Sequence, residues 1–130
     1  MAKKSTRGKV VKELDRVFSL HVRQRNMDEN QNVSCYTCGR SNHYKKMQCG
    51  HFMTRARYST RWDEVNCQTQ CYGCNVMQQG KQYEFGLNLD KEFGVGVSEN
   101  LYRKSMQTVK FMTYELEEKI EHYKSLIETN

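Results

Sequence analysis

The stretch that decides the fold opens with Cys35-Tyr-Thr-Cys38 and closes with Cys71-Tyr-Gly-Cys74-Asn75. Each CxxC pair presents two thiolates on one tight turn, and four soft ligands complete the tetrahedron that Zn²⁺ prefers. We therefore predict a structural zinc ion held by Cys35, Cys38, Cys71 and Cys74. The alternatives are two disulfides, which the absence of other secretory features disfavours, and a thioredoxin-like redox site, for which a βαβ background is missing.

The overall composition indicates a small core. Hydrophobic residues make up 37% of the 130 residues, and the mean hydropathy is -0.91. A metal ion that ties distant segments together is the expected remedy in such a chain. No apolar run approaches the roughly 20 residues of a membrane helix, and no hydrophobic stretch follows the basic N-terminus. We expect a cytoplasmic protein that makes no contact with a membrane.

The charge is distributed unevenly between the two halves of the sequence. Residues 1–62 hold 14 Lys and Arg against 4 Asp and Glu, a charge of +10, and residues 63–130 hold 7 against 11, a charge of −4. A basic half around a zinc motif favours a nucleic-acid partner. The acidic half fits self-association or a solvated face, and the alternative for the basic half is a role in solubility alone.

The N-terminal segment combines a short arm with a helix. Residues 1–8 are predicted to form a basic, flexible arm in which Lys3, Lys4 and Arg7 contact DNA phosphates. Residues 9–27 carry apolar side chains at helical spacing and predict an amphipathic helix. Its Arg23 and Arg25 either line a DNA backbone or belong to a solvated face.

The central segment predicts a strand, a loop, a second strand and a helix. Gly39 permits the tight turn after Cys38, and residues 45–53 read as a strand with His51 near its end. Residues 54–60 form the loop, 61–65 the return strand, and a helix runs from about 71 to 85. This order is that of a ββα-metal (His-Me finger, HNH-like) unit over residues 33–86. The predicted fold class is α+β, with this zinc-stabilised core flanked by N- and C-terminal helices.

The C-terminal segment, residues 87–130, predicts a helical extension of one domain that spans residues 9–130. Glycines divide its first part into short pieces, and the last helix begins with Thr113 as N-cap. Leu116, Ile120, Tyr123 and Ile127 form one apolar stripe along this helix. The stripe fits the core, and its second interpretation is a dimer interface.

Several side chains of the central segment suit a metal-dependent nuclease. His51 is the candidate general base, because the imidazole pKa lies near neutrality. Asn75 directly follows the last cysteine, so its carbonyl oxygen is a candidate ligand of Mg²⁺ or Mn²⁺, with a helix-start hydrogen bond as the alternative. Asn66 is included in the site as the residue that ties the hairpin loop to the helix. Three arginines of this region are predicted to meet phosphates, namely Arg55, Arg57 and Arg61.

These motifs resemble the NinG/Rap family of phage recombination endonucleases. The resemblance rests on Gly50-His51-Phe52, on the run from Arg61 to Asn66, and on Gln70-Cys71-x-x-Cys74-Asn75, followed by Gly80 and Tyr83. It implies a structure-specific endonuclease that acts on branched DNA such as Holliday junctions and D-loops. It also implies a phage protein in the cytoplasm of a bacterial host. Two cuts per junction favour a homodimer.

The pattern is similar as well to the HNH nucleases and to the phage junction resolvase endonuclease VII, in which an Asp precedes the catalytic His. Gly50 occupies that position here, so another residue must supply the second metal ligand, and Asp63, Glu64 or His51 itself could do so. Cys49 and Cys67 are expected to be small buried residues, although either could compete for zinc. The alternative function is a zinc-ribbon DNA-binding module without catalysis.

Overall fold

The computed structural model describes residues 6–128, so Lys3, Lys4 and most of the predicted arm lie outside the described residues. The first helix begins at Arg7, two residues before the predicted start, because Thr6 Oγ1 accepts a hydrogen bond from the Lys9 amide at 3.3 Å and caps it. The elements in chain order are α1 (Arg7–Gln24), β1 (Asn32–Ser34), β2 (Ser41–His43), a 3₁₀ turn (Tyr44–Lys46), β3 (Gln48–His51), α2 (Tyr58–Arg61), β4 (Cys67–Gln70), a π-helical turn (Gly73–Met77), α3 (Gln82–Phe93), α4 (Val97–Ser105) and α5 (Thr113–Leu126).

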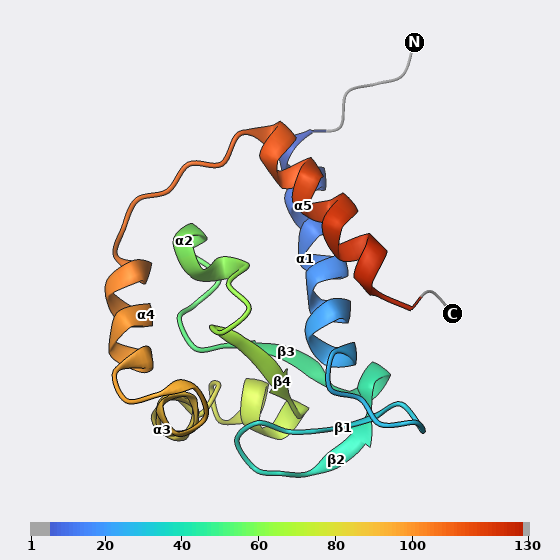
Figure 1. Cartoon of the computed structure of the whole chain (residues 1–130), viewed down its shortest axis with the longest axis vertical. Helices are drawn as coiled ribbons and strands as arrows, with labels where there is room; N and C mark the ends of the chain where they lie inside the picture. Colours follow the sequence, from blue (N-terminus) through green and yellow to red (C-terminus); the bar gives the residue numbers. More distant parts are fainter. Residues whose placement is uncertain (1–5, 129–130) are drawn as a thin grey trace.

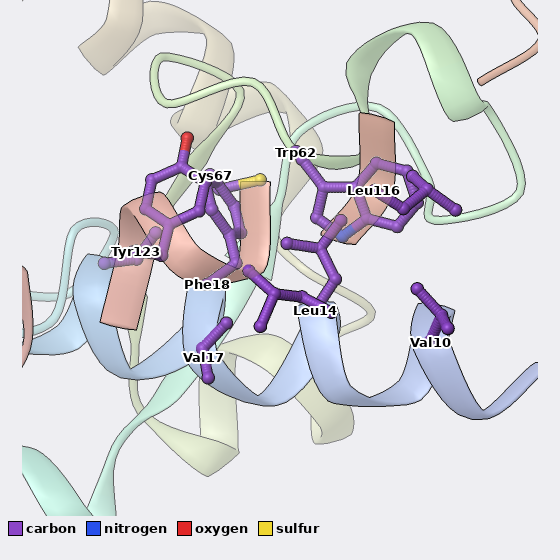
Figure 2. Packing of buried hydrophobic residues seen from close by; sticks show 10 residues of the cluster. Val10, Leu14, Val17, Phe18, Trp62, Cys67, Leu116 and Tyr123 are labelled. Atoms are coloured by element: carbon purple, nitrogen blue, oxygen red, sulfur yellow. The ribbon is translucent and has the colours of Figure 1, made fainter. Parts of the chain in front are cut away.

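The main core lies between the first and the last helix of the chain. Helix α5 runs alongside α1, and both lie on one side of the β3–β4 hairpin (Figure 1). Figure 2 shows the side chains of this cluster, in which Leu14 and Phe18 of α1 lie near Leu116, Tyr123 and Trp62. The apolar stripe of the last helix therefore packs within the chain, as the core interpretation predicted, and three of its members are buried: Leu116, Ile120 and Tyr123.

Two separate antiparallel hairpins form the small sheets. In the first, β1 pairs with β2, and in the second, β3 pairs with β4 so that His51 lies opposite Cys67. Gly39 has a φ of 79° in the turn between β1 and β2, the left-handed conformation that the tight turn requires. The α+β class is thus confirmed as a mixture of helices and small sheets.

The predicted return strand at residues 61–65 is wrong. Tyr58–Arg61 is a short helix, and Asp63 Oδ1 accepts hydrogen bonds from the amides of Val65 and Asn66 at 2.9 and 3.1 Å, which folds this segment into a turn. The strand that returns is β4, Cys67–Gln70. Gln68 and Gln70 are buried although they are polar, so β4 lacks the apolar alternation from which a strand is predicted.

The predicted continuous helix over residues 71–85 is also wrong. The π-helical turn ends at Met77, and the chain then reverses through Gly80, whose φ is 88° and whose carbonyl accepts a hydrogen bond from the buried Gln70 Nε2 at 2.9 Å. A new helix, α3, begins at Gln82. At the last helix, the predicted N-cap Thr113 is wrong, because Thr113 is the first helical residue. The N-cap is Met112, whose amide donates to the Glu115 carboxylate at 3.1 Å.

Candidate active site and metal centre

The two CxxC turns bring their four thiols together. Cys35 and Cys38 lie in the β1–β2 turn, Cys71 follows β4, and Cys74 lies in the π-helical turn. The four sulfur atoms are within 4.8 Å of one another. The sulfurs of a tetrahedral site with Zn–S bonds of about 2.3 Å lie about 3.8 Å apart, and Cys38 Sγ and Cys71 Sγ are separated by 3.7 Å. This cluster could hold a structural zinc ion.

The surroundings of the thiols shift the pKa values of Cys35 and Cys74 in opposite directions. Burial is the largest influence on Cys74 and, with the neighbouring thiols, raises the pKa of this group to about 12. At Cys35, burial is outweighed by hydrogen bonds from Thr37 and from backbone amides, which lower the pKa to about 6. Four thiols this close ionise together only when a cation offsets their mutual repulsion, and a bound zinc ion would supply that charge.

His51 lies at the end of β3 with one ring nitrogen engaged. Nε2 lies 3.0 Å from the carbonyl oxygen of Arg61, so Nε2 carries the proton and donates it to that oxygen. In the neutral ring Nδ1 is then the basic nitrogen. Burial, opposed by the Arg61 hydrogen bond, lowers the pKa of His51 from its ordinary value of 6.5. The imidazole is therefore neutral at pH 7, the form in which it accepts a proton.

A cavity of about 340 Å³ adjoins His51. Asn75 and Arg55 also line it, together with Asp15 and Arg23 of α1 and with Gln48 and Cys49 of β3. Asn75 Nδ2 donates to Gln48 Oε1 at 2.6 Å, which fixes the orientation of the amide. Among residues 6–128, no hydrogen bond occupies Asn75 Oδ1, so this oxygen remains free to act as a ligand or an acceptor.

Asp15 is the carboxylate of this cavity, and sequence reasoning did not identify it. Its Oδ1 accepts from Arg61 Nε at 3.1 Å and from Trp62 Nε1 at 2.9 Å, and its Oδ2 accepts from Arg61 Nη2 at 2.6 Å. Arg61 in turn presents the carbonyl that holds His51. Asp15 thus positions the histidine through Arg61. The feature of the sequence that could have indicated Asp15 is its position as an acidic residue beside the apolar stripe of a basic helix.

The predicted DNA-binding arginines fall into three groups. Arg25 and Arg61 are used internally: Arg25 donates to the carbonyls of Glu64 and Cys67, and Arg61 pairs with Asp15. Arg23 lines the cavity, but its guanidinium also donates to the Tyr44 carbonyl at 3.1 Å, and burial lowers its pKa. Among the predicted DNA-binding arginines, those exposed to solvent are Arg7, Arg55 and Arg57.

Asn66 and Asp63 lie away from the cavity. Asn66 is fully buried; its Oδ1 accepts from the Met53 amide at 2.8 Å, and its Nδ2 donates to the Thr60 carbonyl at 3.0 Å, so it ties together the loop between β3 and β4. Asp63 Oδ2 pairs with Lys104 of α4 at 2.5 Å. Asp63 therefore does not line the cavity with His51. The other candidate, Glu64, has its carboxylate paired with His21 and Arg25.

Gly50 is required by close packing within the second hairpin. A Cβ at this position would collide with the side-chain amide of Gln70. Gln70 is fully buried, and its Nε2 donates to Thr37 Oγ1 and to the Gly80 carbonyl. The position that holds an Asp in HNH nucleases therefore has no room for any side chain here.

The family of the chain follows from comparison with known proteins. Residues 1–129 match the family model described as "Bacteriophage Lambda NinG protein". The chain belongs to the NinG family. This family is linked to phage recombination, and the match confirms the family resemblance seen in the sequence. No curated protein and no solved structure matches the NinG chain. Within residues 6–128, no helix combines the length and the apolar character needed to cross a bilayer.

Proposed function

We propose that this NinG protein is a divalent-cation-dependent endonuclease that cuts branched DNA recombination intermediates. The observation that carries the proposal is the orientation of His51. Its Nε2 is held by the Arg61 carbonyl, its lowered pKa keeps it neutral, and it faces a cavity that also contains an oxygen donor on Asn75 and the guanidinium of Arg55. A neutral, oriented imidazole beside cationic groups suits hydrolysis of a phosphodiester.

The chain contributes three functions to this chemistry. His51 Nδ1 removes a proton from the attacking water, while the Nε2–H···O=C bond to Arg61 keeps the tautomer fixed. Arg55, which lines the cavity, and the exposed Arg57, two residues further along the chain, hold the phosphate backbone. The free Oδ1 of Asn75 is the oxygen donor that would hold Mg²⁺ or Mn²⁺, and such an ion would supply Lewis-acid stabilisation of the scissile phosphate. The expected products carry a 5′-phosphate and a 3′-hydroxyl.

The fold around His51 supports assignment to the ββα-metal type. His51 ends the first strand of the β3–β4 hairpin, a loop tied by Asn66 connects the strands, and Asn75 follows in a helical turn directly after β4. The differences are a π-helical turn where a regular helix is usual, and a glycine before the histidine. Both leave the order of the active residues unchanged.

The test is a cleavage assay on a four-way junction in the presence of Mg²⁺. Replacing His51 by alanine should lower the rate by roughly 10²–10⁴-fold, the usual contribution of a general base. Zinc content and junction affinity should stay unchanged. The matched control is His122→Ala, because His122 lies exposed on α5, away from the cavity. A wild-type rate in the His51→Ala variant would contradict the assignment.

The same assay separates cleavage from binding alone. The NinG family's link to recombination favours branched over linear duplex DNA, and a homodimer would place the two cuts symmetrically. If the wild-type protein shifts the mobility of junction DNA in a gel but does not cut it with Mg²⁺ or Mn²⁺, the protein is a zinc-dependent DNA-binding module. Equal cutting of linear duplex would instead indicate a general nicking enzyme.

A further inference from the structure

A second group of metal-ligating side chains lies on the β3–β4 hairpin. The sulfurs of Cys49 and Cys67 and a ring nitrogen of His51 are within 4.8 Å of one another. The register explains this grouping, because Cys49 pairs with Thr69 and His51 pairs with Cys67, so all four side chains lie on one face of the hairpin. Neither cysteine forms a disulfide.

From this geometry we propose that Cys49, His51 and Cys67 form a binding site for a soft divalent metal such as Zn²⁺, separate from the four-cysteine cluster. Two thiolates and one imidazole are ligands that select zinc and similar ions, and they bind Mg²⁺ poorly. Tetrahedral coordination needs S···N separations of about 3.6 Å, which rotation of the half-buried Cys49 side chain can supply. Binding would release the two thiol protons to solvent.

One ligand of the site is held in place by the surrounding chain, and the other two are accessible from the cavity. Cys67 is fully buried, and its sulfur lies 3.9 Å from Asn66 Nδ2 and 3.5 Å from the Arg61 carbonyl, contacts that hold it in place. Cys49 and His51 line the cavity of about 340 Å³, through which an ion would enter. Three protein ligands with a fourth position open to the cavity is the arrangement of zinc sites that bind water or a substrate.

A metal ion bound at this site would prevent His51 from acting as a general base. If the metal binds Nδ1, it takes the lone pair that would accept the proton from water. If it binds Nε2, the ring proton moves to Nδ1 and the hydrogen bond to the Arg61 carbonyl is lost. Zinc beyond the first equivalent is therefore inhibitory, whereas Mg²⁺ is not. This inhibition rests on the proposed function, but the metal binding does not.

The binding is tested with the whole, reduced chain carrying one zinc per molecule. Titration with Co²⁺ should produce thiolate-to-metal charge-transfer absorption from a further site. Cys49→Ser should weaken this binding by about 100-fold or more, since even partners of a ligand change metal affinity 10–100-fold. Thr69→Ser, on the same face of the hairpin, is the matched control and should bind as wild type. Because Cys49→Ser keeps the four-cysteine cluster, any exchange into that cluster appears equally in both proteins.

Cys67→Ala provides an independent check and should lose the same absorption while its zinc content remains at one per chain. Identical Co²⁺ spectra for wild type and both cysteine variants would overturn the proposal. The second readout is junction cleavage in Mg²⁺ with added Zn²⁺, each variant being normalised to its own zinc-free rate. Wild type should be inhibited, and Cys49→Ser should resist. Absence of cleavage alone refutes the nuclease proposal, whereas absence of a cysteine-dependent second site refutes this inference.

Discussion

The four-cysteine cluster and the His51 cavity are built by different means. The cluster joins two short turns, each with its ligands three residues apart, so its geometry follows from local spacing once β1, β2 and β4 are in place. The cavity draws on α1, β3, the hairpin loop and the π-helical turn, and its histidine is oriented by a carbonyl whose own residue is held by Asp15. The cluster depends on its ligands, and the cavity depends on packing.

The largest effect should come from breaking the cluster. Cys74→Ser removes one buried thiolate, and we expect loss of zinc and a decrease in the free energy of unfolding of more than about 4 kcal/mol, since loss of a structural metal is among the few mechanisms of that size. Elemental analysis and thermal melting measure the two quantities. Full zinc content with an unchanged melting temperature would show that the cluster does not bind structural zinc.

Breaking the support of His51 should have a smaller effect. Asp15→Asn leaves the half-buried guanidinium of Arg61 without a charged partner, and we expect a loss of about 3 kcal/mol in stability, the lower end of values for buried pairs. Cleavage by the folded fraction should also fall, while zinc is retained. The control is Glu13→Gln, which removes an exposed pair with Arg16 and should cost at most about 1 kcal/mol. Equal losses in the two variants would remove Asp15 from its positioning role.

The pH dependence distinguishes the two regions further. Burial lowers the pKa of His51 below 6.5, so the neutral base persists as the pH falls, and the acid limb of the cleavage profile should lie below that value. The unfolded ring takes up a proton at higher pH than the folded one, so stability should also decline with decreasing pH across this interval. Rate profiles and denaturant titrations from pH 5 to 8 would measure both. An acid limb above pH 7 would exclude this histidine as the base.

The smallest effect is expected from an exposed arginine. Arg57→Ala should weaken binding to all DNA several-fold and lower the slope of log K against log salt by about 1, since one phosphate contact is lost. Arg103→Ala on α4, exposed and paired with Glu99, is the control and should leave the slope unchanged. A change confined to junction DNA would instead indicate that Arg57 reads DNA shape.

The sequence predicted the parts of the site that depend on local spacing. The CxxC pairs identified the four cysteines that come together and could hold zinc, and the motif around His51 placed it correctly on the first strand of the hairpin. Asp15 was not predicted because its role depends on contacts with Arg61 and Trp62, which lie 46 and 47 positions further along the chain. The second strand was misplaced because its buried side chains, Gln68 and Gln70, are polar. Their amides form hydrogen bonds inside the chain, so the strand lacks apolar alternation.

The pairing of α1 with α5 has a consequence for synthesis on the ribosome. Gln24 and the backbone of Glu128 exchange two hydrogen bonds across 104 positions, and the apolar face of α1 is covered by Leu116, Ile120 and Tyr123. All four cysteines of the cluster are made before α5, which ends at Leu126. At about 5–20 residues per second, several seconds separate the last cysteine from the end of α5. A zinc ion bound by the cluster could therefore stabilise the nascent chain before α5 is made to cover the apolar face of α1.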